Sequence, residues 1–191
     1  MTEQGGYQIH LELINRCRNG DRLAQTELYS LYYKAMYNTC YRMLNNQVEA
    51  EDVMQESFLS AFLKINSYRG EMSFGSWLKK IVVNKAIDVL RSRKVKFEEI
   101  NEKFAAEDES EAFRNMVSEE SSGLVRKIRE AVKLLPEGFR VVLSLSLFEG
   151  YDHEEIAMIL GISESTSRSQ LARAKKKLVE YLKNEGNETV G

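Results

Sequence analysis

Apolar residues recur every three to four positions along nearly the whole chain, the spacing of helices that bury one face. Runs of alternating β-branched residues are missing, and Pro136 is the single proline. Residues 50–65, AEDVMQESFLSAFLKI, illustrate the pattern. Their predicted inward face comprises Val53, Met54, Ser57, Phe58, Ala61, Phe62 and Ile65. The pattern predicts an all-α protein.

The C-terminal part of the chain predicts a series of helices separated by breaks. Pro136, Gly138 and Gly150 interrupt the apolar spacing, because proline and glycine disfavour a helix interior. The expected helices cover residues 124–134, 139–148, 153–160 and 164–182.

The break between the last two helices has the features of a helix-turn-helix. Gly161 can adopt the positive φ of a tight turn, and Ser163 occupies an N-cap position. Ile156, Leu160 and Ile162 supply apolar contacts around the corner. This spacing favours DNA binding. The alternative is a surface helix that is merely rich in lysine and arginine.

The final helix separates into two faces when it is placed on a helical wheel. The apolar stripe is Leu171, Ala174, Leu178, Tyr181 and Leu182. Opposite it lie Ser165, Ser169, Ala172, Arg173 and Lys176, flanked by Arg168 and Lys175. The candidates for groove contact are Arg168, Ser169, Ala172 and Arg173, and those for phosphate contact are Lys175, Lys176 and Lys177. Ser167 takes a position where such helices usually carry an aliphatic residue, so we expect looser packing there.

The outer side of the helix in residues 50–65 combines acids with apolar residues. It carries Asp52, Gln55, Glu56, Leu59 and Leu63. A monomer's core does not need these two leucines, so the patch is a candidate protein-docking site. Scattered exposed leucines are equally common on ordinary surfaces, and both interpretations stay open at this point.

The next segment pairs an aromatic loop with a helix. Residues 66–77, NSYRGEMSFGSW, form a loop rich in serine and glycine that contains Tyr68 and Arg69. On the following helix the inward side is Leu78, Val82, Ala86 and Val89. The opposite stripe is Trp77, Lys80, Asn84 and Arg91, with Asp88 beside it. Aromatic, cationic and amide groups together suit single-stranded nucleic acid, although a helical tryptophan is more often a core residue.

Charge divides the chain into three parts. Residues 1–96 carry 14 basic and 10 acidic side chains, residues 97–120 carry 2 and 9, and residues 121–191 carry 11 and 10. The acidic stretch predicts a flexible linker, with a solvated helix face as the alternative. We therefore expect two small helical domains, over 1–96 and 124–191, joined by an acidic linker over 97–123.

Several classes of protein find no support in the sequence. The N-terminus is polar and no apolar run is long enough to span a membrane, which favours a cytoplasmic protein. Cys17 and Cys40 are expected to be free thiols, and neither the cysteines nor the two histidines have metal-site spacing. Neither a phosphate-binding loop nor a catalytic triad is visible, so we expect no enzyme and no cofactor.

Three stretches in order resemble an extracytoplasmic-function (ECF) sigma factor of the sigma-70 family. AEDVMQESFLSAF is similar to its polymerase-docking helix, and NSYRGEMSFGSWLKKIVVNKAIDVLR to its −10 element loop and helix. LPEGFRVVLSLSLFEGYDHEEIAMILGISESTSRSQLARAKKKL is similar to its −35 element domain. The resemblance covers residues 9–95 (region 2) and 124–183 (region 4), and skips the linker.

The resemblance implies partners and residue roles. Core RNA polymerase would be contacted at its β′ clamp helices by Asp52, Gln55 and Glu56, and also at its β flap. The loop at Tyr68 and Arg69 would capture a flipped −10 base, with Asn84 nearby, while Arg168, Ser169, Ala172 and Arg173 would face the −35 groove. Promoter DNA would thus be bound in double- and single-stranded form. An anti-sigma factor, often membrane-anchored in this family, is a further implied partner.

Two other interpretations compete with this resemblance. A stand-alone helix-turn-helix regulator would explain residues 124–183, but it gives the surfaces in residues 50–91 no purpose. A decoy that occupies polymerase or an anti-sigma factor should lack one of the basic stripes, and both stripes are present.

Overall fold

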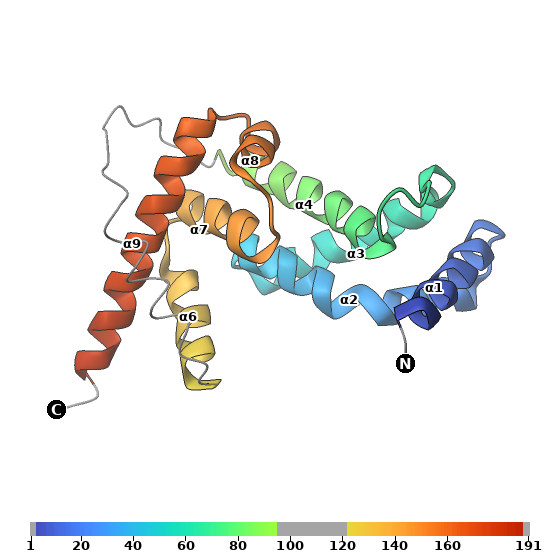
Figure 1. The fold of residues 1–191 in the computed structure, drawn as a ribbon, viewed down its shortest axis with the longest axis horizontal. Coiled ribbons are helices and arrows are strands. Elements are labelled where there is room, and N and C mark those ends of the chain that lie inside the picture. Colours follow the sequence, from blue (N-terminus) through green and yellow to red (C-terminus); the bar gives the residue numbers. More distant parts are fainter. Residues whose placement is uncertain (1–2, 95–121, 189–191) are drawn as a thin grey trace. The chain divides into compact units, whose positions relative to one another are not determined.

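The structure is a computed structural model that describes residues 3–94 and 122–188 (Figure 1). Every regular element in these ranges is a helix, as the sequence predicted. The chain divides into two compact units, Met1–Val89 and Leu90–Gly191. All but the last two residues of the predicted linker, 97–123, lie outside the described residues.

The first unit is a bundle in which α2 packs against both α1 and α3. A short 3₁₀ turn, η1, follows α3 and contacts α1 and α3. Its elements are α1 (Glu3–Arg18), α2 (Arg22–Leu44), α3 (Gln47–Leu63), η1 (Ile65–Ser67) and α4 (Phe74–Ser92), the last of which continues past the boundary at Val89.

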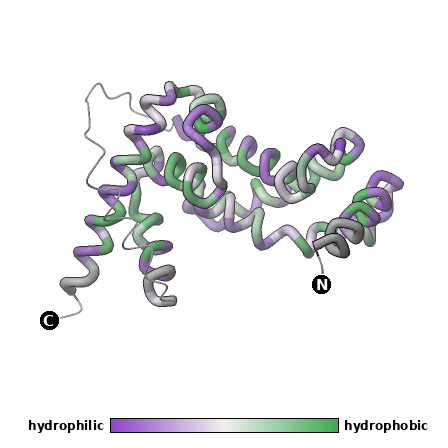
Figure 2. Tube along the Cα trace, viewed as in Figure 1, coloured by the Kyte–Doolittle hydropathy of each residue, from purple (hydrophilic) through white to green (hydrophobic). Residues whose placement is uncertain are grey.

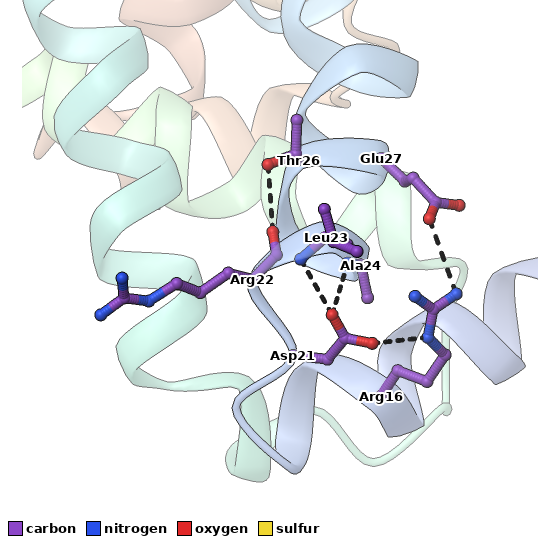
Figure 3. Close-up of polar contacts among 7 residues, drawn as sticks. All are labelled: Arg16, Asp21, Arg22, Leu23, Ala24, Thr26 and Glu27. Atoms are coloured by element: carbon purple, nitrogen blue, oxygen red, sulfur yellow. Dashed lines mark hydrogen bonds and ion pairs between the residues drawn. The ribbon is translucent and has the colours of Figure 1, made fainter.

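Side chains at the corners determine where α2 and α3 begin and end. Asp21 Oδ1 accepts hydrogen bonds from the backbone N–H groups of Leu23 and Ala24, which caps α2 (Figure 3). Asn45 ends α2 with a left-handed backbone at φ 51°. The next residue, Asn46, caps α3, because its side-chain oxygen accepts hydrogen bonds from the backbone N–H groups of Val48 and Glu49.

The apolar faces that the sequence predicted line the core of this unit. The predicted inward residues of 50–65 are buried, with Ile65 in η1 and the others on α3, except for Phe62, which is half-buried. On α4, Leu78, Val82 and Ala86 are buried and Val89 is half-buried. Hydrophobic and hydrophilic residues are interspersed along the helices of this unit (Figure 2). Burial of one face per helix therefore supplies most of the stabilisation.

In the second unit the long helix α9 packs against α6, α7 and α8 (Figure 1). The structure differs from the helix predicted over 139–148. The α-helical part ends at Leu143, and a π-helical turn follows. The elements are α6 (Ser122–Leu134), α7 (Glu137–Leu143), the π-helical turn η2 (Ser144–Phe148), α8 (His153–Leu160) and α9 (Glu164–Glu188).

A buried cation closes the corner between α6 and α7, a feature that the sequence analysis missed. The guanidinium of Arg140 donates a hydrogen bond to the carbonyl of Leu135 at 2.9 Å. Glu137 lies 3.6 Å away as an ion-pair partner. Burial lowers the pKa of Arg140 from its usual value, and the carboxylate of Glu137 opposes that shift. The side chain thus satisfies a backbone carbonyl left over where α6 ends.

Candidate protein and nucleic-acid interfaces

The outer stripe of α3 is exposed along its length. Asp52, Gln55 and Glu56 are exposed, as predicted, and Leu59 and Leu63 are 64% and 86% exposed. Such exposure removes both leucines from the core of this unit. Their positions one turn apart place them on the same side of the helix as the acids.

The stripe has one further member, Val48, that the sequence pattern did not predict. Val48, in the first turn of α3, is 69% exposed and shares the side of Asp52 and Leu59. The polar members contact neighbouring side chains, since Glu56 pairs with Lys85 of α4 at 3.2 Å and Gln55 bonds Glu51 at 3.3 Å. The apolar and polar side chains on this side of the helix are named here the α3 stripe: Val48, Asp52, Gln55, Glu56, Leu59 and Leu63.

The loop between η1 and α4 is built around Tyr68, whose ring is only 4% exposed. Its hydroxyl donates to the carbonyl of Met72 at 2.7 Å, and its ring contacts Phe74 and Trp77. The sequence analysis placed this ring among the DNA-contacting groups. In the structure the ring lies inside the loop, while the neighbouring Arg69 is exposed.

Two further residues support the loop and were not found from the sequence. Arg18 of α1 donates a hydrogen bond to the backbone carbonyl of Tyr68 at 2.5 Å. Gly75, at the start of α4, lies so close to Tyr32 that an added Cβ would stand 2.9 Å from its ring. These contacts join segments far apart in the chain, so helical periodicity carries no signal for them.

The polar stripe of α4 emerges beside this loop. Trp77 is half-buried, while Lys80, Asn84 and Arg91 are exposed together with Asp88. The ring of Trp77 packs on Tyr68 and Phe74, so this half-buried residue belongs in part to the core, and its contact with nucleic acid stays a prediction.

The second unit contains the predicted helix-turn-helix. Gly161 has φ 69° at the turn, and Ser163 Oγ accepts a hydrogen bond from the backbone N–H of Thr166. Both features match the sequence prediction. A capping box formed by Asp152 and Glu155 fixes the start of α8.

The outer face of α9 presents most of its predicted contact residues to solvent. Ser165, Arg168 and Lys176 are exposed, and Ser169, Ala172, Arg173 and Lys175 are partly exposed. The predicted inward stripe is buried apart from Tyr181, which is half-buried. Arg168 forms an ion pair with Glu164 one turn earlier. The helix therefore offers hydroxyl, methyl and guanidinium groups on one side and an apolar surface on the other.

Ser167 differs from its expected behaviour. Its side chain is fully buried, and Oγ lies 2.9 Å from Nδ1 of His153 at the start of α8. The start of α9 is thus fixed by a hydrogen bond at the point where the sequence predicted looser packing.

The described residues add two findings on chemistry. Cys17 and Cys40 are buried free thiols, as predicted. No group of three or more potential metal ligands occurs within 3–94 and 122–188, and none of the helices described there is long and apolar enough to cross a membrane.

These features define a helical protein of two units, with a helix-turn-helix in the second unit. Family models agree with that class: sigma-70 region 2 matches residues 28–95 and sigma-70 region 4 matches residues 126–178. The chain belongs to the sigma-70 family, and within it to the ECF RNA polymerase sigma factors.

Individual proteins support the same assignment. The chain is 32% identical to the ECF RNA polymerase sigma-E factor of Haemophilus influenzae over 86% of this chain and 90% of that protein. It is 28% identical to the ECF RNA polymerase sigma factor SigW of Bacillus subtilis, over 90% and 95%. The fold resembles that of the sigma factor RpoE in its complex with the anti-sigma factor NepR from Bartonella quintana. That match has a TM-score of 0.54 and 22% identity, and covers 83% of this chain and 96% of that one.

Proposed function

We propose that this sigma factor binds core RNA polymerase and directs it to promoters through three separate surfaces. The observation that carries this proposal is the α3 stripe, because two leucines that are 64% and 86% exposed lie outside the core and on the same side of α3 as the acids. A stand-alone regulator would not need that stripe. The chain acts without catalytic groups or a cofactor of its own, in the cytoplasm.

The α3 stripe docks on the polymerase. Asp52, Gln55 and Glu56 face the β′ clamp helices, while Leu59 and Leu63 supply apolar contact. Buried apolar residues flanked by a polar rim are the usual composition of protein interfaces. The second unit makes a separate contact with the β flap.

The loop at 66–73 and the stripe on α4 bind the −10 element as a single strand. Arg69 and the accessible part of Trp77 lie next to the base, and Lys80, Asn84 and Arg91 follow the strand. Tyr68 contributes as an internal support of the loop, since its ring is buried. A base held outside the duplex offsets the unstacking cost of a few kcal/mol, which promotes melting.

The outer face of α9 reads the −35 element in the major groove. Arg168, Ser169, Ala172 and Arg173 contact base edges, and Lys175 and Lys176 contact phosphates with Ser165. Arg168 must leave its ion pair with Glu164 to reach a base. Because that pair is exposed, its separation costs little.

The charge distribution supports dependence on the polymerase. Residues 97–120 carry 2 basic and 9 acidic side chains, so this segment repels free DNA and fits a basic path such as the RNA exit channel. The polymerase then holds two weak DNA-binding units near each other, which raises the effective concentration of the second contact. An anti-sigma factor that covers the polymerase-binding surfaces is the proposed regulator.

Run-off transcription tests this proposal. Bacterial core polymerase is incubated with a library of genomic promoter fragments, with and without the chain. Transcripts that require both components support a sigma factor, and their start sites reveal the promoter elements. Tight sequence-specific DNA binding by the chain alone, without polymerase-dependent transcripts, would contradict the proposal and indicate a stand-alone regulator.

A further inference from the structure

A polar contact lies inside the helix-turn-helix, where apolar packing is expected. Ser167 is the fourth residue of α9 and is fully buried, and His153 is the first residue of α8. Ser167 Oγ and His153 Nδ1 are 2.9 Å apart, in a hydrogen bond whose donor depends on the imidazole tautomer. Ile156 and Leu160 of α8 are buried in the same unit.

The other hydroxyl groups at the start of α9 bond locally. Ser163 Oγ contacts the backbone N–H and the hydroxyl of Thr166, and Ser169 donates to the backbone carbonyl of Thr166. Those contacts stabilise the first turn of α9 without fixing its orientation. The bond between His153 and Ser167 differs because it joins α9 to α8.

We propose that the hydrogen bond between His153 and Ser167 sets the rotation of α9 about its own axis, so that both residues are positioning residues for −35 recognition. This inference rests on the proposed function, because it assigns α9 to the −35 groove. Neither side chain needs to touch DNA. They affect recognition through Arg168 and Ala172. Arg168 follows Ser167 directly, and Ala172 lies about one turn after Arg168.

The physical reason is that apolar packing has little directional preference, whereas a hydrogen bond has a narrow range of length and angle. A rotation of α9 by about 10° would move a side-chain tip some 6 Å from the axis by about 1 Å. A hydrogen bond to a base edge does not survive a displacement of that size. The His153–Ser167 bond therefore adds a directional constraint to the apolar contacts that α9 makes with α6, α7 and α8.

The surroundings favour a neutral imidazole, which can donate at one nitrogen and accept at the other. Burial lowers the pKa of His153, and the nearby cations Arg168 and Lys175 lower it further. The acids Asp152 and Glu164 oppose this shift. A serine hydroxyl suits either tautomer, because it can both donate and accept.

A purely structural role is the competing explanation, in which the pair only satisfies two polar groups in a core. The two roles differ in one measurable quantity. Loss of folding reduces the active fraction and lowers transcription from all promoters by the same factor. A change in the rotation of α9 alters the discrimination ratio, which is open-complex formation on the cognate promoter divided by that on a promoter with one −35 base pair replaced.

The test uses the full chain with core polymerase and a promoter from the run-off experiment, in cognate form and with one −35 base pair replaced. The variants are Ser167→Ala, His153→Gln and the double substitution His153→Leu with Ser167→Val, which replaces the polar pair by an apolar one. Ser57→Ala serves as the matched control, because Ser57 is also fully buried but bonds within its own helix, to the carbonyl of Val53. Open-complex formation on both promoters gives the discrimination ratio.

The double variant should fold and bind the polymerase, and its discrimination ratio should fall roughly fivefold. Ser167→Ala should lower the ratio in the same direction, His153→Gln should preserve most of it, and Ser57→Ala should not change it. An unchanged ratio in both Ser167→Ala and the double variant would overturn the inference. If the wild-type chain gives no polymerase-dependent transcript, the proposed function fails instead, which separates the two failures.

Discussion

A single carboxylate, that of Asp21, holds the corner between α1 and α2. One of its oxygens caps α2, and the other lies 2.8 Å from Nε of Arg16 (Figure 3). Arg16 also approaches Glu27 at 3.6 Å, so a residue of α1 is tied to α2. The Arg16 guanidinium, followed by the capping hydrogen bonds, holds the pKa of Asp21 below its usual range.

Replacement of Asp21 tests this corner. Asp21→Ala removes the cap and the ion pair, so we expect Tm to fall by a few degrees. Asp21→Asn keeps a capping oxygen and should lose less. Because the carboxyl pKa is lowered on folding, the ionic contribution is present above about pH 4 and disappears as pH falls through the folded value. Equal Tm values for both variants and wild type across that range, measured by circular dichroism, would contradict the assignment.

His153 should also make stability depend on pH, but in a higher pH range than Asp21. Its pKa is lowered by burial and by two cations, so the unfolded chain takes up a proton first, near pH 6.5. The contribution is fully present above that pH and is lost as pH falls from about 6.5 through the lower folded value. Thermal unfolding of wild type and His153→Gln between pH 8 and pH 5 checks this expectation.

In that comparison the Tm difference should change in favour of the variant as pH falls. His10→Gln, in the first unit, is the matched control for the same substitution at another position. A difference that stays constant across the range would show that His153 titrates alike in folded and unfolded chains.

Residue chemistry could be predicted from sequence where it is local. Gly161 and Ser163 act within a turn of a few residues, and both were assigned from residue type and spacing. The burial of Tyr68 and the partner of Ser167 depend on residues 4 to 50 positions away, so residue type carried no information about them. The sequence indicates only that Tyr68 lies in a loop rich in serine and glycine, and it gives no sign that the residue is buried there.

The α3 stripe is the feature of a whole element with the clearest functional consequence. Leu59→Gln with Leu63→Gln should weaken binding to core polymerase at least about tenfold, because a leucine side chain buried on binding contributes about 1.5–3 kcal/mol of apolar transfer free energy. The Tm should change little, since both side chains are exposed. Fluorescence anisotropy of a labelled chain titrated with core polymerase measures the affinity.

Leu23→Gln is the matched control, because Leu23 is 72% exposed but lies at the start of α2, outside the α3 stripe. Its affinity for polymerase should equal that of wild type. If the α3 double variant binds as tightly as this control, the exposed leucines are ordinary surface residues.

Helical periodicity predicted which face of α3, α4 and α9 is buried, because one repeat governs each helix. It could not predict the π-helical turn at Ser144–Phe148, since the apolar residues there continue the preceding pattern. Val48 lies outside the predicted helical segment 50–65, because the N-cap at Asn46 starts α3 earlier.

At the scale of the whole molecule, the chain has two compact units with separate cores and a strongly acidic segment in the sequence between them. The proposed DNA-binding surface of each unit comprises a small number of polar side chains, and the net charge of the chain is −2. Protein–DNA affinity depends largely on phosphate neutralisation, so free chain should bind DNA weakly. Under the proposed function, the polymerase supplies the missing electrostatic attraction and joins both contacts.

Promoter opening is the most direct measurement of this account. A fluorescent adenine analogue placed in the −10 element reports unstacking when it is mixed with the chain, with core polymerase, or with both. The account predicts a fluorescence rise only with both components, and loss of that rise when either the −10 or the −35 element is replaced. Opening by core polymerase alone, or tight promoter binding by the chain alone without opening, would contradict it.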